Sequence, residues 1–105
     1  MNTDTVDGER IGLGYADTPA DTTWKNHVTY LSPGTLVCCS TDGLTDQIGG
    51  PKNIAFGKRR LRKAIQGYGS HPAPELTRLL IQDLRAYQGT HNRRDDLTFL
   101  SFRID

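Results

Sequence analysis

Apolar side chains in the first half of the chain gather in two short segments. Residues 27–31, HVTYL, alternate apolar and polar side chains, which is typical of a strand with one buried face. Residues 35–40, TLVCCS, form a continuous apolar run typical of a strand covered on both faces. Because the Ser-Pro-Gly sequence at 32–34 favours a tight turn, we expect the two strands to form a hairpin.

The second half has helical spacing. Within residues 51–69, leucine, alanine and isoleucine recur three and four positions apart, and Gly67 marks a stop. Residues 74–89 carry four leucines on one helical face, with proline at the start and glycine at the end. Residues 97–104 then alternate as a closing strand. The order β-β-α-α-β predicts an α+β fold, with two helices on a mainly antiparallel sheet.

Residues 1–25 are rich in glycine, aspartate and threonine and have no sustained periodicity. We therefore expect a loop-rich lead-in over 1–25 and one folded unit over 26–105. Composition is that of a soluble globular protein, with 35% hydrophobic and 24% charged residues and a net charge of +1. This balance argues against nucleic acid or an acidic membrane as a partner.

We expect a cytoplasmic protein, or a cytoplasmic piece of a longer one. No apolar run approaches the roughly 20 residues that cross a bilayer, and the polar, acidic start lacks the order of a signal peptide. Cys38 and Cys39 are adjacent and outside any metal-binding pattern, which favours two buried thiols in a reducing compartment.

Acidic residues stand at the ends of two predicted strands. Asp42 follows the run at 35–40, and Asp95 and Asp96 precede the closing strand. If these strands are antiparallel neighbours, the carboxylates meet at one edge of the sheet. Such a cluster needs a cation or a shared proton, and oxygen ligands favour Mg²⁺ or Mn²⁺. Gly43 would let the backbone turn sharply beside such a ligand.

Each acidic motif also has a simpler interpretation. Thr-Asp-Gly is a common turn, and the two aspartates after Arg93 and Arg94 would suit a solvated loop with surface ion pairs. The simpler interpretation is favoured for either motif alone. Their occurrence together at matching strand ends favours a site.

Three stretches of the sequence resemble the C-terminal half of the protein phosphatase 2C-like, or PPM, phosphatases, in the SpoIIE-like bacterial regulatory branch. They are LSPGTLVCCSTDGLTDQ, AFGKRRL and APELTRLLIQDLRAYQGTHNRRDDLTFLSFRI. That branch shows a Pro-Gly turn, an apolar strand ending in Ser/Thr-Asp-Gly, a Phe-Gly-x-x-Arg-Leu segment and a final Asp-Asp-Ile/Leu-Thr. All four appear here in order.

The resemblance implies an α-β-β-α sandwich that binds two Mn²⁺ or Mg²⁺ ions, with metal-activated water attacking phosphoserine or phosphothreonine. Carried over by position, Asp42 and Asp95 would be metal ligands, with Gly43, Asp46 and Asp96 in supporting roles. No catalytic residue beyond the metal ligands is expected. The substrate would be a bacterial regulatory phosphoprotein, for example a STAS-type anti-sigma-factor antagonist.

Length is where the chain departs from the family, whose domain is about twice as long. The first half of that domain supplies the ligands of the other metal. We therefore expect this chain to be the second half of a domain, weakly active or inactive alone. Half a sandwich would expose apolar sheet surface and favour a homodimer. The alternative is a catalytically inactive interaction module with the phosphatase fold.

Residues 58–63, KRRLRK, are the most basic segment. A solvated helix face is the favoured interpretation, docking of an acidic phosphoprotein the second, and nucleic-acid binding a distant third.

Overall fold

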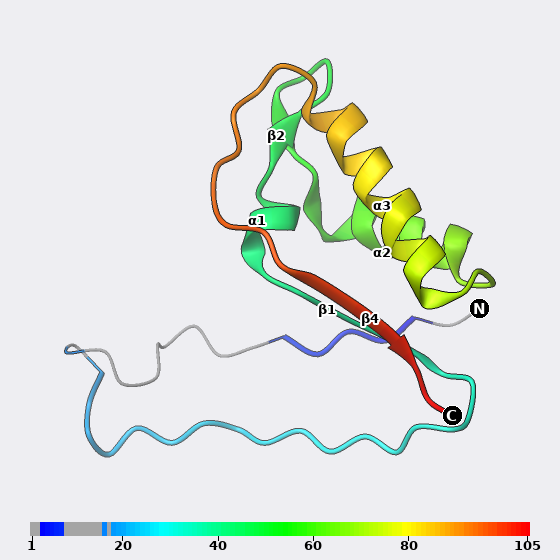
Figure 1. The fold of residues 1–105 in the computed structure, drawn as a ribbon. Coiled ribbons are helices and arrows are strands. Elements are labelled where there is room, and N and C mark those ends of the chain that lie inside the picture. The colour runs from blue at the N-terminus through cyan, green and yellow to red at the C-terminus, as the bar shows by residue number, and fades with distance from the viewer. Residues whose placement is uncertain (1–2, 8–15, 17) are drawn as a thin grey trace.

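The computed structural model describes residues 3–7, 16 and 18–105. Its main sheet pairs β1 (Leu36–Ser40) with β4 (Phe99–Arg103) in antiparallel fashion. The register places Leu36 opposite Arg103 and Ser40 opposite Phe99. The two strands lie side by side, so the end of β1 and the start of β4 share one edge (Figure 1). The predicted antiparallel sheet is confirmed, and the condition set for the acidic residues, that these two strands are antiparallel neighbours, is met.

Two helices cover one face of this sheet, as the leucine spacing predicts (Figure 1). They are α2 (Gly57–Tyr68) and α3 (Ala73–Gln88). Proline lacks a backbone N–H, but in the first turn of α3 this costs no hydrogen bond, because N–H groups in the first turn of a helix have no intrahelical partner. At the other end, Gly89 adopts a positive φ of 55° and its N–H donates to the Arg85 carbonyl.

The core lies between the helices and the sheet. Leu44, Phe56, Leu80 and Leu84 form its buried cluster, and each is at most 4% exposed. Burying a side chain of this size contributes about 1.5–3 kcal/mol. Because Leu44 belongs to the segment after β1, core packing fixes that segment against α3.

Three short elements that the sequence did not predict connect β1 to α2. They are α1 (Asp42–Thr45), β2 (Ile48–Gly49) and β3 (Ile54–Ala55). The last two pair antiparallel as a small second sheet. Elements of two to four residues are too short to show a hydrophobic period, so only their packing reveals them.

The predicted strand over 27–31, and with it the predicted hairpin, is wrong. Residues 27–31 form no strand, and Val28 and Tyr30 are 80% and 95% exposed. The turn at 32–34 is present, but Gly34 and Thr35 bond to Ile104 and so extend the pairing of β1 with β4. Alternation of apolar and polar residues indicates amphipathicity, but a strand also needs a second strand to pair with its backbone N–H and C=O groups.

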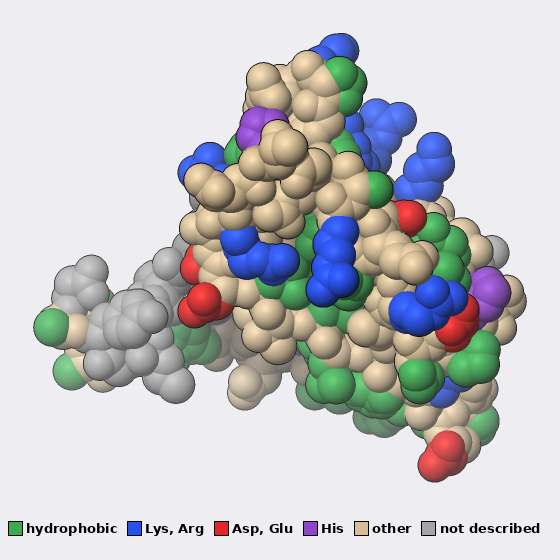
Figure 2. All heavy atoms as spheres, turned by 45° about the horizontal axis from the view of Figure 1, so that its top comes forward, with side chains coloured by type: hydrophobic (Ala, Val, Ile, Leu, Met, Phe, Trp, Pro, Cys, Tyr) green, Lys and Arg blue, Asp and Glu red, His purple; other side chains and the backbone are tan. Residues whose placement is uncertain are grey.

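The sheet face opposite the helices carries exposed apolar side chains, as predicted for half a sandwich. Leu100 is 56% exposed and Phe102 is 41% exposed. On β1, Cys39 and Val37 are their register partners. Figure 2 shows hydrophobic side chains gathered in the lower part of the view, with Lys and Arg scattered above them.

The mixture of helices and antiparallel strands confirms the α+β class. The lead-in over 1–25 lies partly outside the described residues, so the division at residue 25 stays a prediction. Among the described residues, no helix has both the length and the apolar character to span a membrane.

Candidate metal centre

Thr41 connects the end of β1 to the segment before β4. Its N–H donates to the Thr98 carbonyl at 3.0 Å, and its Oγ1 accepts from the Thr98 N–H at 2.9 Å. The same hydroxyl lies 3.3 Å from the Asp96 carbonyl and donates to it. These bonds extend the pairing of β1 with β4 beyond the last paired residues of the sheet. They hold Asp42, which follows Thr41, and Asp96 at the same edge.

Gly43 brings the two acidic segments into backbone contact. A Cβ at this position would lie 2.1 Å from the Asp96 carbonyl oxygen and 3.1 Å from that of Asp95. The glycine is therefore required for close approach of α1 to the Asp95–Asp96 backbone. Gly43 lies within the four-residue helix α1 and is not among the residues with positive φ, so it is the close approach that requires glycine here.

The structure brings Asp42 and Asp95 to the same edge of the sheet and leaves both exposed. One oxygen of Asp95, Oδ1, accepts the Asp96 N–H at 2.7 Å, which orients that carboxylate. Asp46 ends α1, where its N–H donates to the Asp42 carbonyl at 2.8 Å. Asp46 and Asp96 are also exposed.

The donor chemistry of this edge fits a hard divalent cation in kind, because Asp42 and Asp95 offer only carboxylate oxygens. Among residues 3–7, 16 and 18–105, no group of three or more His, Cys, Asp or Glu is placed to hold a metal ion. Two carboxylates at this edge are fewer than the about six oxygen ligands that such a cation takes. A bound Mg²⁺ or Mn²⁺ would complete its coordination sphere with water or with oxygens from elsewhere.

Comparison with known proteins decides the family. The family model described as Stage II sporulation protein E (SpoIIE) matches residues 5–105. The chain belongs to the SpoIIE family. No curated protein matches this SpoIIE-family chain. A solved structure, the SiaA-PP2C domain of Pseudomonas aeruginosa, is similar to it at 40% identity with a TM-score of 0.76. The match covers 81% of this chain and 35% of that one.

The Phe-Gly-x-x-Arg-Leu segment of this SpoIIE-family chain serves packing. Phe56 is 4% exposed and meets the Tyr87 ring edge-on, with centroids 5.3 Å apart. Arg60 stacks over the same ring at 4.8 Å and donates to the Phe56 carbonyl at 3.1 Å. These contacts join the start of α2 to the end of α3.

Gln47 holds the loop before Asp95, a role that the sequence did not suggest. It is 1% exposed, and its Nε2 donates to the Ile48 and Asn92 carbonyls, each at 3.0 Å. With Thr41 at the far end, the loop is therefore held on both sides of Asp95. A glutamine directly before a two-residue strand gives no sequence signal for this contact.

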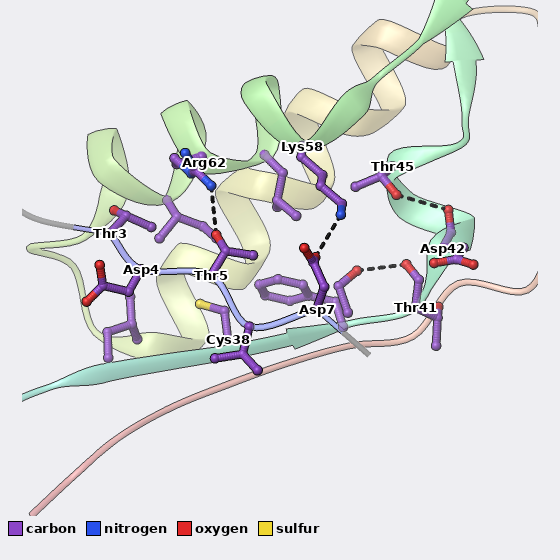
Figure 3. Close-up of a pocket in the computed structure, with 16 residues that line it drawn as sticks. Thr3, Asp4, Thr5, Asp7, Cys38, Thr41, Asp42, Thr45, Lys58 and Arg62 are labelled. Carbon is purple, nitrogen blue, oxygen red and sulfur yellow. Dashed lines mark hydrogen bonds and ion pairs between the residues drawn. The ribbon is translucent and has the colours of Figure 1, made fainter. Parts of the chain in front are cut away.

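A cavity of about 640 Å³ opens beside Asp42, between α2 and β1 (Figure 3). Thr41, Asp42 and Thr45 line one end of it, and Lys58 and Arg62 of α2 line its side. Residues 3–7 also line it, which the sequence did not predict because that segment has no periodic pattern.

Proposed function

We propose that this chain takes part in metal-dependent dephosphorylation of phosphoserine or phosphothreonine on a bacterial regulatory protein in the cytoplasm. The observation that carries the proposal is the contact of Gly43 with the Asp95–Asp96 backbone, which places Asp42 and Asp95 at one edge. Membership of the SpoIIE family and similarity to a PP2C domain support the reaction class.

In this proposal Asp42 and Asp95 hold Mn²⁺ or Mg²⁺, and Gly43, Asp46 and Asp96 support them. The chemistry that such an ion supplies when bound is a lower pKa for coordinated water and neutralisation of phosphoryl charge. The chain's own contribution is positional: Thr41 and Gln47 fix the two carboxylate-bearing segments relative to each other. By family resemblance, a STAS-type anti-sigma-factor antagonist is the substrate class to test first.

The chain spans 35% of the solved PP2C-domain chain that it resembles. We therefore propose that alone it binds metal weakly, with a dissociation constant on the order of 10⁻⁴–10⁻³ M, since affinity falls with the number of charged ligands. Turnover by the isolated chain is expected to be low for the same reason.

The test combines Mn²⁺ binding with hydrolysis of p-nitrophenyl phosphate and a phosphoserine peptide. We expect Asp42→Asn and Asp95→Asn each to abolish Mn²⁺ binding and any turnover above background. Asp21→Asn, an equal charge change in the segment before β1, serves as the matched control. Robust turnover that persists in Asp42→Asn would contradict the proposal. Phosphopeptide binding with no Mn²⁺ binding would instead indicate the inactive interaction module.

A further inference from the structure

The cavity beside Asp42 is a groove with an apolar floor and a basic side, which we call the α2 groove. Its floor is formed by Leu61 and Ile65 of α2 together with Leu36, Cys38 and Phe99 of the sheet. Lys58 and Arg62 stand one helical turn apart along its side. Thr41, Asp42 and Thr45 close the end nearest the candidate metal centre.

The chain's own residues 3–7, TDTVD, lie in the α2 groove (Figure 3). Arg62 Nη2 donates to Thr5 Oγ1 at 2.8 Å. Lys58 Nζ forms an ion pair with Asp7 Oδ1 at 2.7 Å. An acidic segment therefore lies along the side of the groove that carries Lys58 and Arg62, while Asp42 lines the end of the groove.

The distance between Lys58 and Arg62 along the helix matches the distance between alternate residues of an extended chain. Residues four apart on a helix are separated by about 6 Å along its axis. Residues two apart on an extended chain are separated by about 6.6 Å. Lys58 and Arg62 therefore reach alternate side chains of one extended segment, as they reach Asp7 and Thr5 here.

Residues 3–7 run along the α2 groove with their C-terminal end toward the candidate metal centre. Thr5 meets Arg62 and Asp7 meets Lys58, which lies in the first turn of α2, the end nearer α1. In Figure 3, Asp7 lies toward Thr41 and Asp42, and Thr3 lies at the far end. A peptide seated in the same direction would run its C-terminal end toward Asp42.

We propose that the α2 groove binds an extended acidic segment of the phosphoprotein substrate, with acids at alternate positions on the N-terminal side of the phosphorylated residue. The identification of the partner as a substrate rests on the proposed function. Residues 3–7 occupy the groove until that segment displaces them. The Lys58–Asp7 ion pair itself opposes displacement little, because both side chains are 67% exposed and exposed ion pairs contribute little net stability.

Fluorescence anisotropy without metal tests the groove independently of the metal centre. The probe is a short fluorescein-labelled peptide with Asp at alternate positions before a phosphoserine, and its control has Asn at those positions. We expect the 105-residue chain to bind the Asp peptide about two- to ten-fold more tightly than the Asn peptide, because each exposed ion pair that the Asn peptide lacks contributes modestly. Equal affinities would overturn the proposal without any variant.

Variants assign the binding to the groove. Lys58→Gln with Arg62→Gln is expected to weaken binding of the Asp peptide about two- to ten-fold. Lys63→Gln, on α2 but outside the residues that line the groove, should leave binding unchanged. Asp7→Asn, which loosens the chain's own segment, should tighten peptide binding by up to about five-fold. Equal binding by the Lys58/Arg62 variant and the parent chain would overturn the proposal.

The remaining outcomes separate the two proposals. Binding of the Asp peptide through Lys58 and Arg62 by a chain that does not bind Mn²⁺ would overturn the proposed function and support the groove. Mn²⁺ binding without preference for the Asp peptide would overturn the groove and leave the function. If oligo-dT binds as tightly as the Asp peptide, the groove is a general anion site and the proposal fails.

Discussion

Replacement of Gly43 by alanine tests the contact that positions the candidate centre. The added Cβ would lie 2.1 Å from the Asp96 carbonyl oxygen and 2.7 Å from its carbon. Both are backbone atoms that Thr41 and Gln47 hold in place on either side. Restoring even 3.0 Å requires α1 and this loop to separate by about 0.9 Å. Overpacking of this kind costs about 1–3 kcal/mol.

The expected result is a lower free energy of unfolding in urea and a melting temperature lower by roughly 4–8 °C for each kcal/mol lost. Gly67→Ala is the matched control, because Gly67 lies in α2 and a Cβ there meets nothing within 4 Å. Alanine should be neutral or stabilising at that position by up to about 1 kcal/mol. If Gly43→Ala were as stable as Gly67→Ala, the close approach of α1 to Asp95–Asp96 would be refuted.

Two further predictions concern the sheet. Burial raises the pKa of the Cys38 thiol, neighbouring Cys39 raises it further, and Arg103 opposes both. At pH 8 a smaller fraction of Cys38 is therefore thiolate than in an ordinary cysteine, and Cys38 is also less exposed than Cys39. The Cys38→Ser chain, which keeps only Cys39, should therefore react faster with Ellman's reagent than the Cys39→Ser chain, which keeps only Cys38. Equal rates would contradict this. The exposed apolar sheet face predicts self-association, which Leu100→Thr with Phe102→Thr should reduce in light scattering. A monomeric parent chain at high concentration would contradict that expectation.

The sequence predicted those elements that are long enough to show a hydrophobic pattern of their own. Three of the four leucines of 74–89 form the buried stripe of α3, and the apolar run at 35–40 specifies β1. Residues 27–31 show the limit of this reasoning. Their alternation is real, but no described strand pairs with them, and pairing is a tertiary property.

The site was predictable to the level of the strand ends. That β1 ends just before Asp42 and β4 begins after Asp95 follows from hydrophobicity, and antiparallel pairing then brings the two acids to one edge. The supports of that edge were not predictable. Gln47 acts through burial and Gly43 through backbone contact, and neither property has a local sequence pattern. The α2 groove likewise depends on residues 3–7, which are distant in sequence from α2.

The most direct test of the account is the effect of Mn²⁺ on the amide signals of the ¹⁵N-labelled chain. A paramagnetic ion held jointly by Asp42 and Asp95 should broaden the signals of 42–44 and 95–97 together at the same metal concentration. Asp42→Asn should abolish the broadening in both segments. Broadening of either segment that persists in Asp42→Asn, or in Asp95→Asn, would contradict a shared metal centre at this edge of the sheet.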